Sequence, residues 1–318
     1  ATGSFEMAYE MGKITAIEGR ALGIHMTYAP VVDVNINPDN PVISARSLGE
    51  RPETVGRLAA AFIRGCQENG MIATAKHFPG HGDTALDSHN LMPSINADIN
   101  RLEQVELFPF AEAIRAGVEA VMTAHLFVPA LDPTPGLPAT LSPLILTDLL
   151  RKKMGFKGLI VTDAMTMGGV TTAFSAQEAA LKSVQAGVDM VLLPPDLPGV
   201  IYALVRAVRE GAIPESRIDD SARRVLELKA RLGLQHNRYV DIGLLPEKIA
   251  SRQHLEQAAR TFEKSVTLVK NERDVLPLTP EVTADKIAIL SLSSDADDYF
   301  AGQTFIRDLQ KRKPGTSV

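Results

Sequence analysis

The chain has 318 residues, enough for one large domain or two ordinary ones, and 45% of the residues are hydrophobic while 22% are charged. The net charge of −5 gives no reason to expect nucleic acid or an anionic membrane surface as a partner. Cys66 is the only cysteine, which excludes an intrachain disulfide, and no apolar run approaches the roughly 20 residues of a membrane span.

Strand and helix patterns alternate along the first 210 residues. A helical pattern over 5–22 is followed by a strand-like run over 23–34, and a helix over 52–69 is followed by a strand over 72–77. The pattern continues with a helix, a strand, a helix, a strand, a helix, a strand and a helix, over 98–116, 120–125, 142–154, 158–165, 177–186, 189–194 and 197–209. The strand cores are continuously apolar, as parallel strands buried on both faces are. The sequence therefore predicts five βα units in an α/β fold.

The chain changes character after a last predicted helix over 218–234. Residues 235–250 are typical of a linker, and a further helix is predicted over 254–264. A buried-strand pattern at 286–292 indicates that a second α/β unit begins here, with too few residues left to complete an ordinary domain.

Polar residues collect where the predicted strands end. They are Asp33, Lys76, His77, His125 and Asp163. In a βα barrel the active site forms at this edge, and an open doubly wound sheet also binds ligands there. The placement indicates an enzyme without deciding between the two folds.

The stretch 72–90, IATAKHFPGHGDTALDSHN, carries three of the seven histidines. A proline and two glycines oppose a regular helix, and about twenty residues separate His77 from the next helix, a loop length that is more often functional than idle. Asp87 and His89 are two residues apart, so in an extended loop their side chains face the same way. A carboxylate can fix the tautomer of such an imidazole, which can then donate a proton and later accept one.

These motifs carry a resemblance to a known family. KHFPGHGDTALDSHN at 76–90, with RSLG at 46–49 and VTDAMTM at 161–167, resembles the family 3 glycoside hydrolases, and the D-S-H at 87–89 is similar to their β-N-acetylglucosaminidase branch. The resemblance implies a (β/α)8 TIM-type barrel followed by an α/β sandwich domain. The stretch SVTLVKNERDVLPL resembles the entry to that second domain. With five of eight units recognisable, we expect residues 1–240 to be a barrel domain lacking its N-terminal strands. Residues 241–318 are then expected to be a linker and the incomplete start of the C-terminal domain.

The same resemblance implies roles for individual residues. Asp163 is the expected nucleophile of a retaining mechanism, and His89, oriented by Asp87, is the expected acid and base. Among the expected substrate-binding residues, Lys76, His77 and Arg46 match family residues that contact the sugar. Asp33 and His125 join them by their position at equivalent strand ends, with support of neighbouring side chains as the alternative.

The expected reaction is hydrolysis of terminal β-linked N-acetylglucosamine, with peptidoglycan fragments (muropeptides) as the substrate class that the resemblance implies. Nothing in the sequence argues for a metal or an organic cofactor, and cytoplasmic and cell-envelope locations both stay open. Three alternatives remain: a phosphorylase that uses phosphate in place of water, an inactive carbohydrate-binding protein, and a metal-dependent hydrolase. The metal would be held by a loop cluster of His77, His81, Asp83, Asp87 and His89.

Overall fold

The computed structural model describes residues 2–84, 92–272, 276, 289–290 and 302–312. The chain divides into two units, Ala1–Val266 and Thr267–Val318. In the second unit the structure describes one helix, α11 (Gln303–Arg312). The strand predicted over 286–292 lies mostly outside the described residues. The predicted domain boundary at residue 240 stays a prediction.

A parallel sheet of three strands forms the centre of the first unit. Its order is β1 (Thr74–Phe78), β2 (Ala120–Thr123) and β3 (Leu159–Val161), with Ala120 beside both Thr74 and Leu159. Every strand residue is buried except Lys76, which is partly buried. The predicted α/β class with parallel strands is therefore confirmed.

Two predicted strands are not regular strands. The segment 23–34 runs beside β1, but it forms only two isolated bridges, Met26 with Ile72 just before β1 and Val31 with Lys76 of β1, and Pro30 has no N–H to donate to a ladder. In 189–194 only Met190 forms a bridge, to Val161 of β3. There the backbone N–H of Leu192 is bound by the Thr162 hydroxyl, so a side chain takes a donor that a strand would give to a carbonyl.

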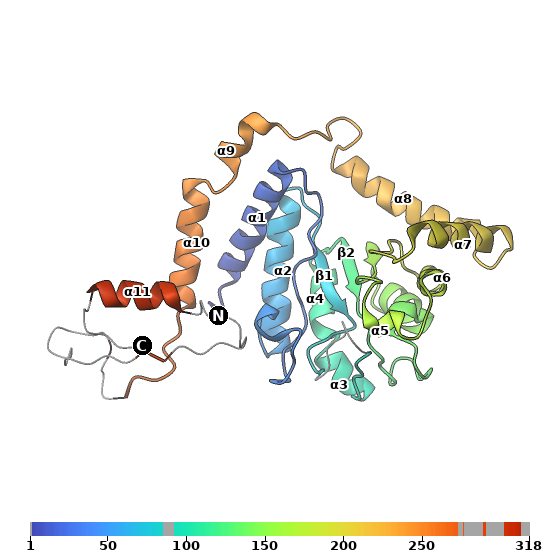
Figure 1. The fold of residues 1–318 in the computed structure, drawn as a ribbon, viewed down its shortest axis with the longest axis horizontal. Coiled ribbons are helices and arrows are strands. Elements are labelled where there is room, and N and C mark those ends of the chain that lie inside the picture. Colours follow the sequence, from blue (N-terminus) through green and yellow to red (C-terminus); the bar gives the residue numbers. More distant parts are fainter. Residues whose placement is uncertain (1, 85–91, 273–275, 277–288, 291–301, 313–318) are drawn as a thin grey trace. The chain divides into compact units, whose positions relative to one another are not determined.

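The helices α1 (Phe5–Ala21) and α2 (Pro52–Glu68) confirm their predictions and lie side by side (Figure 1). Their axes approach closely because Gly12 of α1 faces the backbone of α2. A Cβ atom on Gly12 would lie 2.2 Å from the carbonyl oxygen of Phe62. Ser4 caps the start of α1 by accepting from the backbone N–H of Met7.

The prediction of a single helix over 98–116 is wrong, because the segment forms two helices, α3 (Ile99–Gln104) and α4 (Phe108–Arg115). Pro109 lies in the first turn of α4, where its missing N–H costs nothing, whereas in a continuous helix it would remove a hydrogen bond. The segment predicted over 142–154 forms η3 (Leu144–Lys153), a π-helix.

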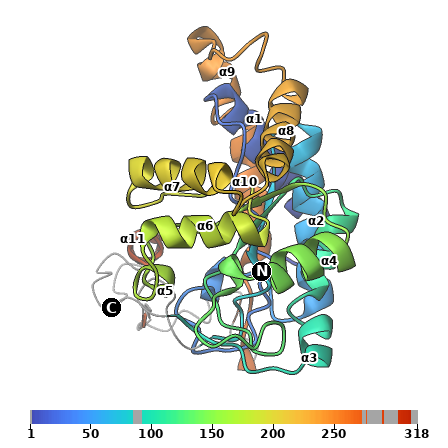
Figure 2. The same ribbon diagram turned by 90° about the vertical axis from the view of Figure 1, so that its right-hand side faces the viewer.

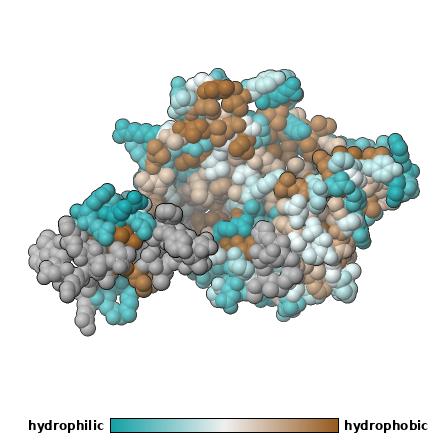
Figure 3. Space-filling view, viewed as in Figure 1, coloured by the Kyte–Doolittle hydropathy of each residue, from teal (hydrophilic) through white to brown (hydrophobic). Residues whose placement is uncertain are grey.

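The remaining elements are helical, and all but η1 and η2 follow β3 in the chain. Figure 2 shows α6 and α7 packed side by side. Residues 235–250, predicted as a linker, contain two short helices, and Figure 3 shows hydrophobic surface there, with Ile242 77% exposed. The bounds are η1 (Ser44–Arg46), η2 (Ala139–Leu141), α5 (Gly168–Thr171), α6 (Ala176–Ala186), α7 (Leu197–Arg209), α8 (Glu215–Arg231), η4 (Ile242–Leu244), α9 (Leu245–Lys248) and α10 (Arg252–Ser265).

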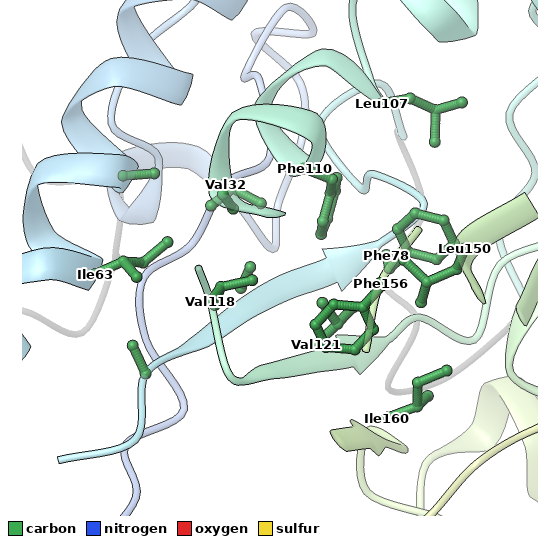
Figure 4. Packing of buried hydrophobic residues seen from close by; sticks show 14 of the residues in the cluster. Val32, Ile63, Phe78, Leu107, Phe110, Val118, Val121, Leu150, Phe156 and Ile160 are labelled. Carbon is green, nitrogen blue, oxygen red and sulfur yellow. The ribbon is translucent and has the colours of Figure 1, made fainter. Parts of the chain in front are cut away.

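The core lies between the sheet and the helices α2, α4 and η3 (Figure 4). Phe78 of β1 meets Phe110 of α4 edge to face, with ring centroids 5.1 Å apart. Each large apolar side chain buried in this way contributes about 1.5–3 kcal/mol. The packing holds the carboxyl ends of β1 and β3 in fixed positions, and the candidate site is built there. In the described part of the chain, none of the helices combines the length and apolarity needed to cross a bilayer.

Candidate active site

The carboxyl ends of β1 and β3 bring His77 and Asp163 together. His77 is the fourth residue of β1, and Asp163 follows β3 by two residues. The Nε2 atom of His77 lies 3.9 Å from Oδ2 of Asp163. The Asp163 side chain is 23% exposed, and its Oδ1 accepts a 2.8 Å hydrogen bond from the backbone N–H of Ala164. One carboxylate oxygen is thus fixed by the backbone, while the carboxylate as a whole stays accessible.

Asp33 orients the ring of His77. Asp33 is fully buried, and its carboxylate accepts from the backbone N–H groups of His77 and His81 and lies 2.7 Å from Nδ1 of His77. A carboxylate only accepts, so Nδ1 carries the proton and Nε2 is left toward Asp163. The expectation that Asp33 binds substrate stays a prediction, whereas its contacts are those of a residue that positions His77.

Arg46 and Lys76 place two cationic groups beside this pair. Arg46, exposed in η1, donates to the carbonyl of Val42 and lies 3.5 Å through Nη2 from Nε2 of His77. A guanidinium only donates, so Nε2 of His77 accepts here, in agreement with the tautomer set by Asp33. Burial, and secondly the charge of Arg46, lowers the pKa of Lys76, which the carboxylates of Asp163 and Asp33 oppose.

His125 lies two residues beyond β2 and is 1% exposed. Its Nδ1 is 2.9 Å from the Thr140 hydroxyl and its Nε2 is 3.1 Å from the carbonyl oxygen of Ala164. Burial lowers the pKa of His125, so the ring is neutral near pH 7. Both ring nitrogens therefore meet protein atoms, and this geometry gives His125 no contact with a substrate. The substrate contact expected of His125 stays a prediction.

The loop after β1 is fixed by its own polar side chains. The carbonyl of His81 accepts from the Asn40 side chain at 2.8 Å, and the Thr84 hydroxyl lies 2.9 Å from Nδ1 of His81. Burial lowers the pKa of His81. Asp83 pairs with Arg101 of α3 at 2.8 Å. His81 and Asp83 therefore shape this loop.

Arg101 also pairs, at 2.7 Å, with Glu106, which is 4% exposed and packs against Gly80. Burial raises the pKa of Glu106, and the charge of Arg101 opposes that rise. A Cβ atom on Gly80 would lie 2.8 Å from the Glu106 side chain, and Gly80 has φ of +130°, so this turn requires glycine.

The predicted acid and base, His89, and its partner Asp87 lie outside the described residues, so their roles stay predictions. The metal alternative drew on the same loop. Among the residues that the structure describes, no three histidine, cysteine, aspartate or glutamate side chains converge as metal ligands. Asn40 and Thr140 were not identified from the sequence, and no local pattern around them signals their contacts with His81 and His125.

The comparison with known families agrees with the motifs in the sequence. The model of the glycosyl hydrolase family 3 N terminal domain matches residues 1–228. The chain belongs to glycosyl hydrolase family 3. Among curated members it is 34% identical over 280 residues to the beta-hexosaminidase A of Pseudoalteromonas piscicida, covering 82% of this chain and 46% of that protein. The chain spans about half the length of such curated relatives.

Solved structures show the same family relationship. A glycoside hydrolase family 3 beta-N-acetylglucosaminidase from Paenibacillus sp. str. FPU-7 matches with a TM-score of 0.83 at 39% identity, over 92% of this chain and 56% of that one. The beta-glucoside phosphorylase BglX matches with a TM-score of 0.90 at 30% identity, over 100% of this chain and 59% of that one. The chain is thus similar both to a protein named for hydrolysis and to one named for phosphorolysis.

Proposed function

We propose that this chain carries the nucleophile and sugar-binding residues of a retaining β-N-acetylglucosaminidase, which hydrolyses terminal β-linked N-acetylglucosamine. The observation that carries the proposal is the accessible carboxylate of Asp163, 3.9 Å from a histidine whose ring Asp33 orients. The named activities of the beta-hexosaminidase and beta-N-acetylglucosaminidase relatives support the same reaction.

The reaction has two displacements. In the first, Asp163 attacks the anomeric carbon, the bond to the leaving oxygen breaks, and His89 gives that oxygen a proton. In the second, neutralised His89 takes a proton from water, which attacks the same carbon and releases Asp163. Two inversions at one carbon give net retention. Asp87 is proposed to hold the His89 ring as Asp33 holds His77.

The sugar is proposed to lie against Lys76, Arg46 and His77. Lys76 and Arg46 carry only donors, which suits the lone pairs of sugar hydroxyls. Nη2 of Arg46 meets the ring of His77, the histidine beside Asp163, and the charge of Asp163 acts on the pKa of Lys76. Muropeptides from peptidoglycan are the proposed substrate class, because they present terminal N-acetylglucosamine in β linkage.

We also propose that the parallel sheet belongs to a (β/α)8 TIM-type barrel. The order β1-β2-β3 follows the chain, and the bridged segments 23–34 and 189–194 extend it on its two sides, as consecutive strands of a barrel do. In this proposal residues 1–240 contribute five of the eight units, and residues 241–318 lead into an α/β sandwich domain.

Replacing Asp163 by Ala tests the nucleophile in the protein that carries this chain. We expect turnover of an aryl N-acetylglucosaminide to fall by about 10³-fold or more. Azide should restore part of the turnover by entering the vacated space, and the azide product should have the inverted, α configuration. Asp148→Ala, at an exposed aspartate paired with Lys152, is the matched control and should keep full activity. Full activity of Asp163→Ala would contradict the proposal.

Replacing His89 by Ala tests the acid and base. Substrates with poor leaving groups should slow much more than activated aryl substrates, because only the former need a proton in the first step. Equal loss on both kinds of substrate would contradict this role.

Phosphorolysis is the second candidate, favoured by the full coverage of this chain in the phosphorylase match. Phosphate would replace water as the acceptor in the second displacement. Assays with and without inorganic phosphate distinguish the two reactions: a sugar 1-phosphate identifies the phosphorylase, and the free sugar at an unchanged rate identifies the hydrolase.

A further inference from the structure

A line of polar contacts crosses the site behind Asp163. It begins at Thr123, the last residue of β2, whose hydroxyl lies 2.8 Å from that of Thr140 in η2. The Thr140 hydroxyl lies 2.9 Å from Nδ1 of His125, and Nε2 of His125 lies 3.1 Å from the carbonyl oxygen of Ala164. Thr123, Thr140 and His125 are all buried. The line therefore joins β2 and η2 to the residue that follows Asp163.

The direction of each hydrogen bond follows from the groups involved. A carbonyl oxygen only accepts, so Nε2 of His125 must donate to Ala164. A ring that is neutral then has no proton on Nδ1, which accepts from the Thr140 hydroxyl. The carbonyl oxygen of Ala124 also lies 2.9 Å from that hydroxyl, so the two acceptors share its one proton, and Thr123 donates to Thr140. The two ring nitrogens of His125 thus have different partners, a carbonyl oxygen and a hydroxyl, which gives the ring one orientation.

The Ala164 peptide links this line to the carboxylate. Its N–H donates to Oδ1 of Asp163 at 2.8 Å, while its carbonyl accepts from His125 and, at 3.1 Å, from the backbone N–H of Met167. A shift of this residue would carry the N–H group away from Asp163. Because attack at an anomeric carbon depends on carboxylate position, a displacement of about 1 Å can lower the rate by roughly 10²-fold.

We propose that His125 is a positioning residue that fixes the Asp163 carboxylate through the Ala164 peptide, with Thr140 fixing the ring of His125. The inference rests on the proposed function of Asp163. It assigns His125 no contact with the sugar, in place of the substrate-binding role expected from its position at a strand end.

Two substitutions of His125 separate positioning from simple filling of space. His125→Leu keeps the bulk and removes the donor, whereas His125→Gln can place an amide N–H near the position of Nε2. Thr140→Val removes the hydroxyl that orients the ring. Leu126→Val is the matched control, because Leu126 is the next residue, is fully buried and packs in an apolar cluster with Leu102 and Val128.

The readouts are kcat and KM on an aryl N-acetylglucosaminide, the thermal midpoint, and the rate of covalent labelling of Asp163 by a fluorinated N-acetylglucosaminyl fluoride, followed by intact mass. We expect His125→Leu to lower kcat and the labelling rate by about 10²-fold, with KM within about twofold. His125→Gln should recover most of both rates, and Thr140→Val should lower both about tenfold. Leu126→Val should lower the thermal midpoint without slowing labelling.

Several outcomes would overturn the inference. They are unchanged labelling by His125→Leu, a raised KM with unchanged kcat, or equal slowing by His125→Leu and His125→Gln. If His125→Leu does not fold, Thr140→Val decides, and wild-type labelling by that variant counts against the proposal. Activity that survives in Asp163→Ala would instead refute the proposed function, so the two failures are distinguishable.

Discussion

Asp33 and Asp189 both have fully buried side chains, and they stand at opposite ends of the two segments that flank the sheet. Asp33 lies near the end of the bridged segment 23–34 beside β1, at the carboxyl end where the candidate site lies. Asp189 is the first residue of the segment 189–194, just before the bridge of Met190 with β3, and so lies at the amino end of that segment. The two carboxylates differ in what binds them, and that difference separates a functional end of the sheet from a structural one.

Asp189 is neutralised by permanent cations. Arg151 pairs with it at 2.5 Å and Arg224 at 3.0 Å, while Arg217 lies 3.7 Å away. The Ser221 hydroxyl and the backbone N–H of Ile160 also donate to it. Burial lowers the pKa of Arg151 to about 10, with Asp189 opposing the shift, so this arginine stays charged at any physiological pH.

Asp33 has neutral donors instead, since the described groups that bind it are two backbone N–H groups and a histidine ring. Its negative charge is balanced by no permanent cation in direct contact in the described part of the chain. Such an arrangement orients His77 and leaves the negative charge of Asp33 beside the site without a neutralising cation. The comparison teaches that burial alone does not identify a functional carboxylate, whereas the chemistry of its donors does.

The strongest way to break the comparison is Asp33→Asn. An amide places an N–H group against the donors of His77 and favours the wrong tautomer of the ring. We expect kcat on an aryl N-acetylglucosaminide to fall by about 10²–10⁴-fold, the upper figure being known for such a change beside a catalytic histidine. Steady-state kinetics and circular dichroism of the same samples measure this. Turnover within twofold of the wild type would remove the distinction between the two aspartates.

Asp189→Ala should act on stability. It leaves three arginines without their shared partner, and breaking a buried ion pair in this way costs about 3–5 kcal/mol in free energy of unfolding. Urea unfolding measures this, and the folded fraction should keep the wild-type kcat. Asp148→Ala, which removes an exposed pair, should cost less than about 1 kcal/mol. A large loss of kcat in folded Asp189→Ala would show that this end also serves the site.

The pH dependence of stability sharpens the picture of the functional end. Burial lowers the pKa of both His81 and His125 below the ordinary value, so the unfolded chain binds their protons more tightly than the folded one. Their contribution to stability is present above about pH 6.5 and is lost as the pH falls below it, by at most about 1.4 kcal/mol per pH unit for each group.

His125→Gln removes one of these two titrating groups. The free energy of unfolding, measured by urea between pH 5 and pH 8, should therefore change less steeply with pH for the variant than for the wild type. Equal slopes would mean that His125 takes up its proton in the folded protein as readily as in the unfolded one.

The smallest effect concerns a group at neither end of the sheet. Cys66 of α2 is fully buried, and burial raises the pKa of its thiol to about 12. At pH 8 the folded protein should therefore react with a thiol reagent far more slowly than the urea-unfolded protein, which should react at one site. Cys66→Ala should keep wild-type kcat. Rapid reaction in the folded state would show that α2 opens more readily than its packing on α1 indicates.

The sequence by itself determined the alternation of strands and helices, the helices α1 and α2, the family, and the polar residues at the strand ends. These are local signals, because apolar periodicity, capping residues and contiguous motifs lie within one element. The regular strands expected over 23–34 and 189–194 were wrong. Whether a backbone N–H joins a ladder there depends on Pro30 and on a Thr162 hydroxyl from another segment.

Only the tertiary structure decided the partners of the buried polar groups. Asp33 and His77 are 44 residues apart in the chain, and His125 meets Thr140 and Ala164, which lie 15 and 39 residues on. Asp189 pairs with arginines of α8 that no motif links to it. A strand end predicts that a side chain reaches the rim, but burial and hydrogen-bond geometry decide whether it faces substrate or another residue, and both arise from packing between distant segments.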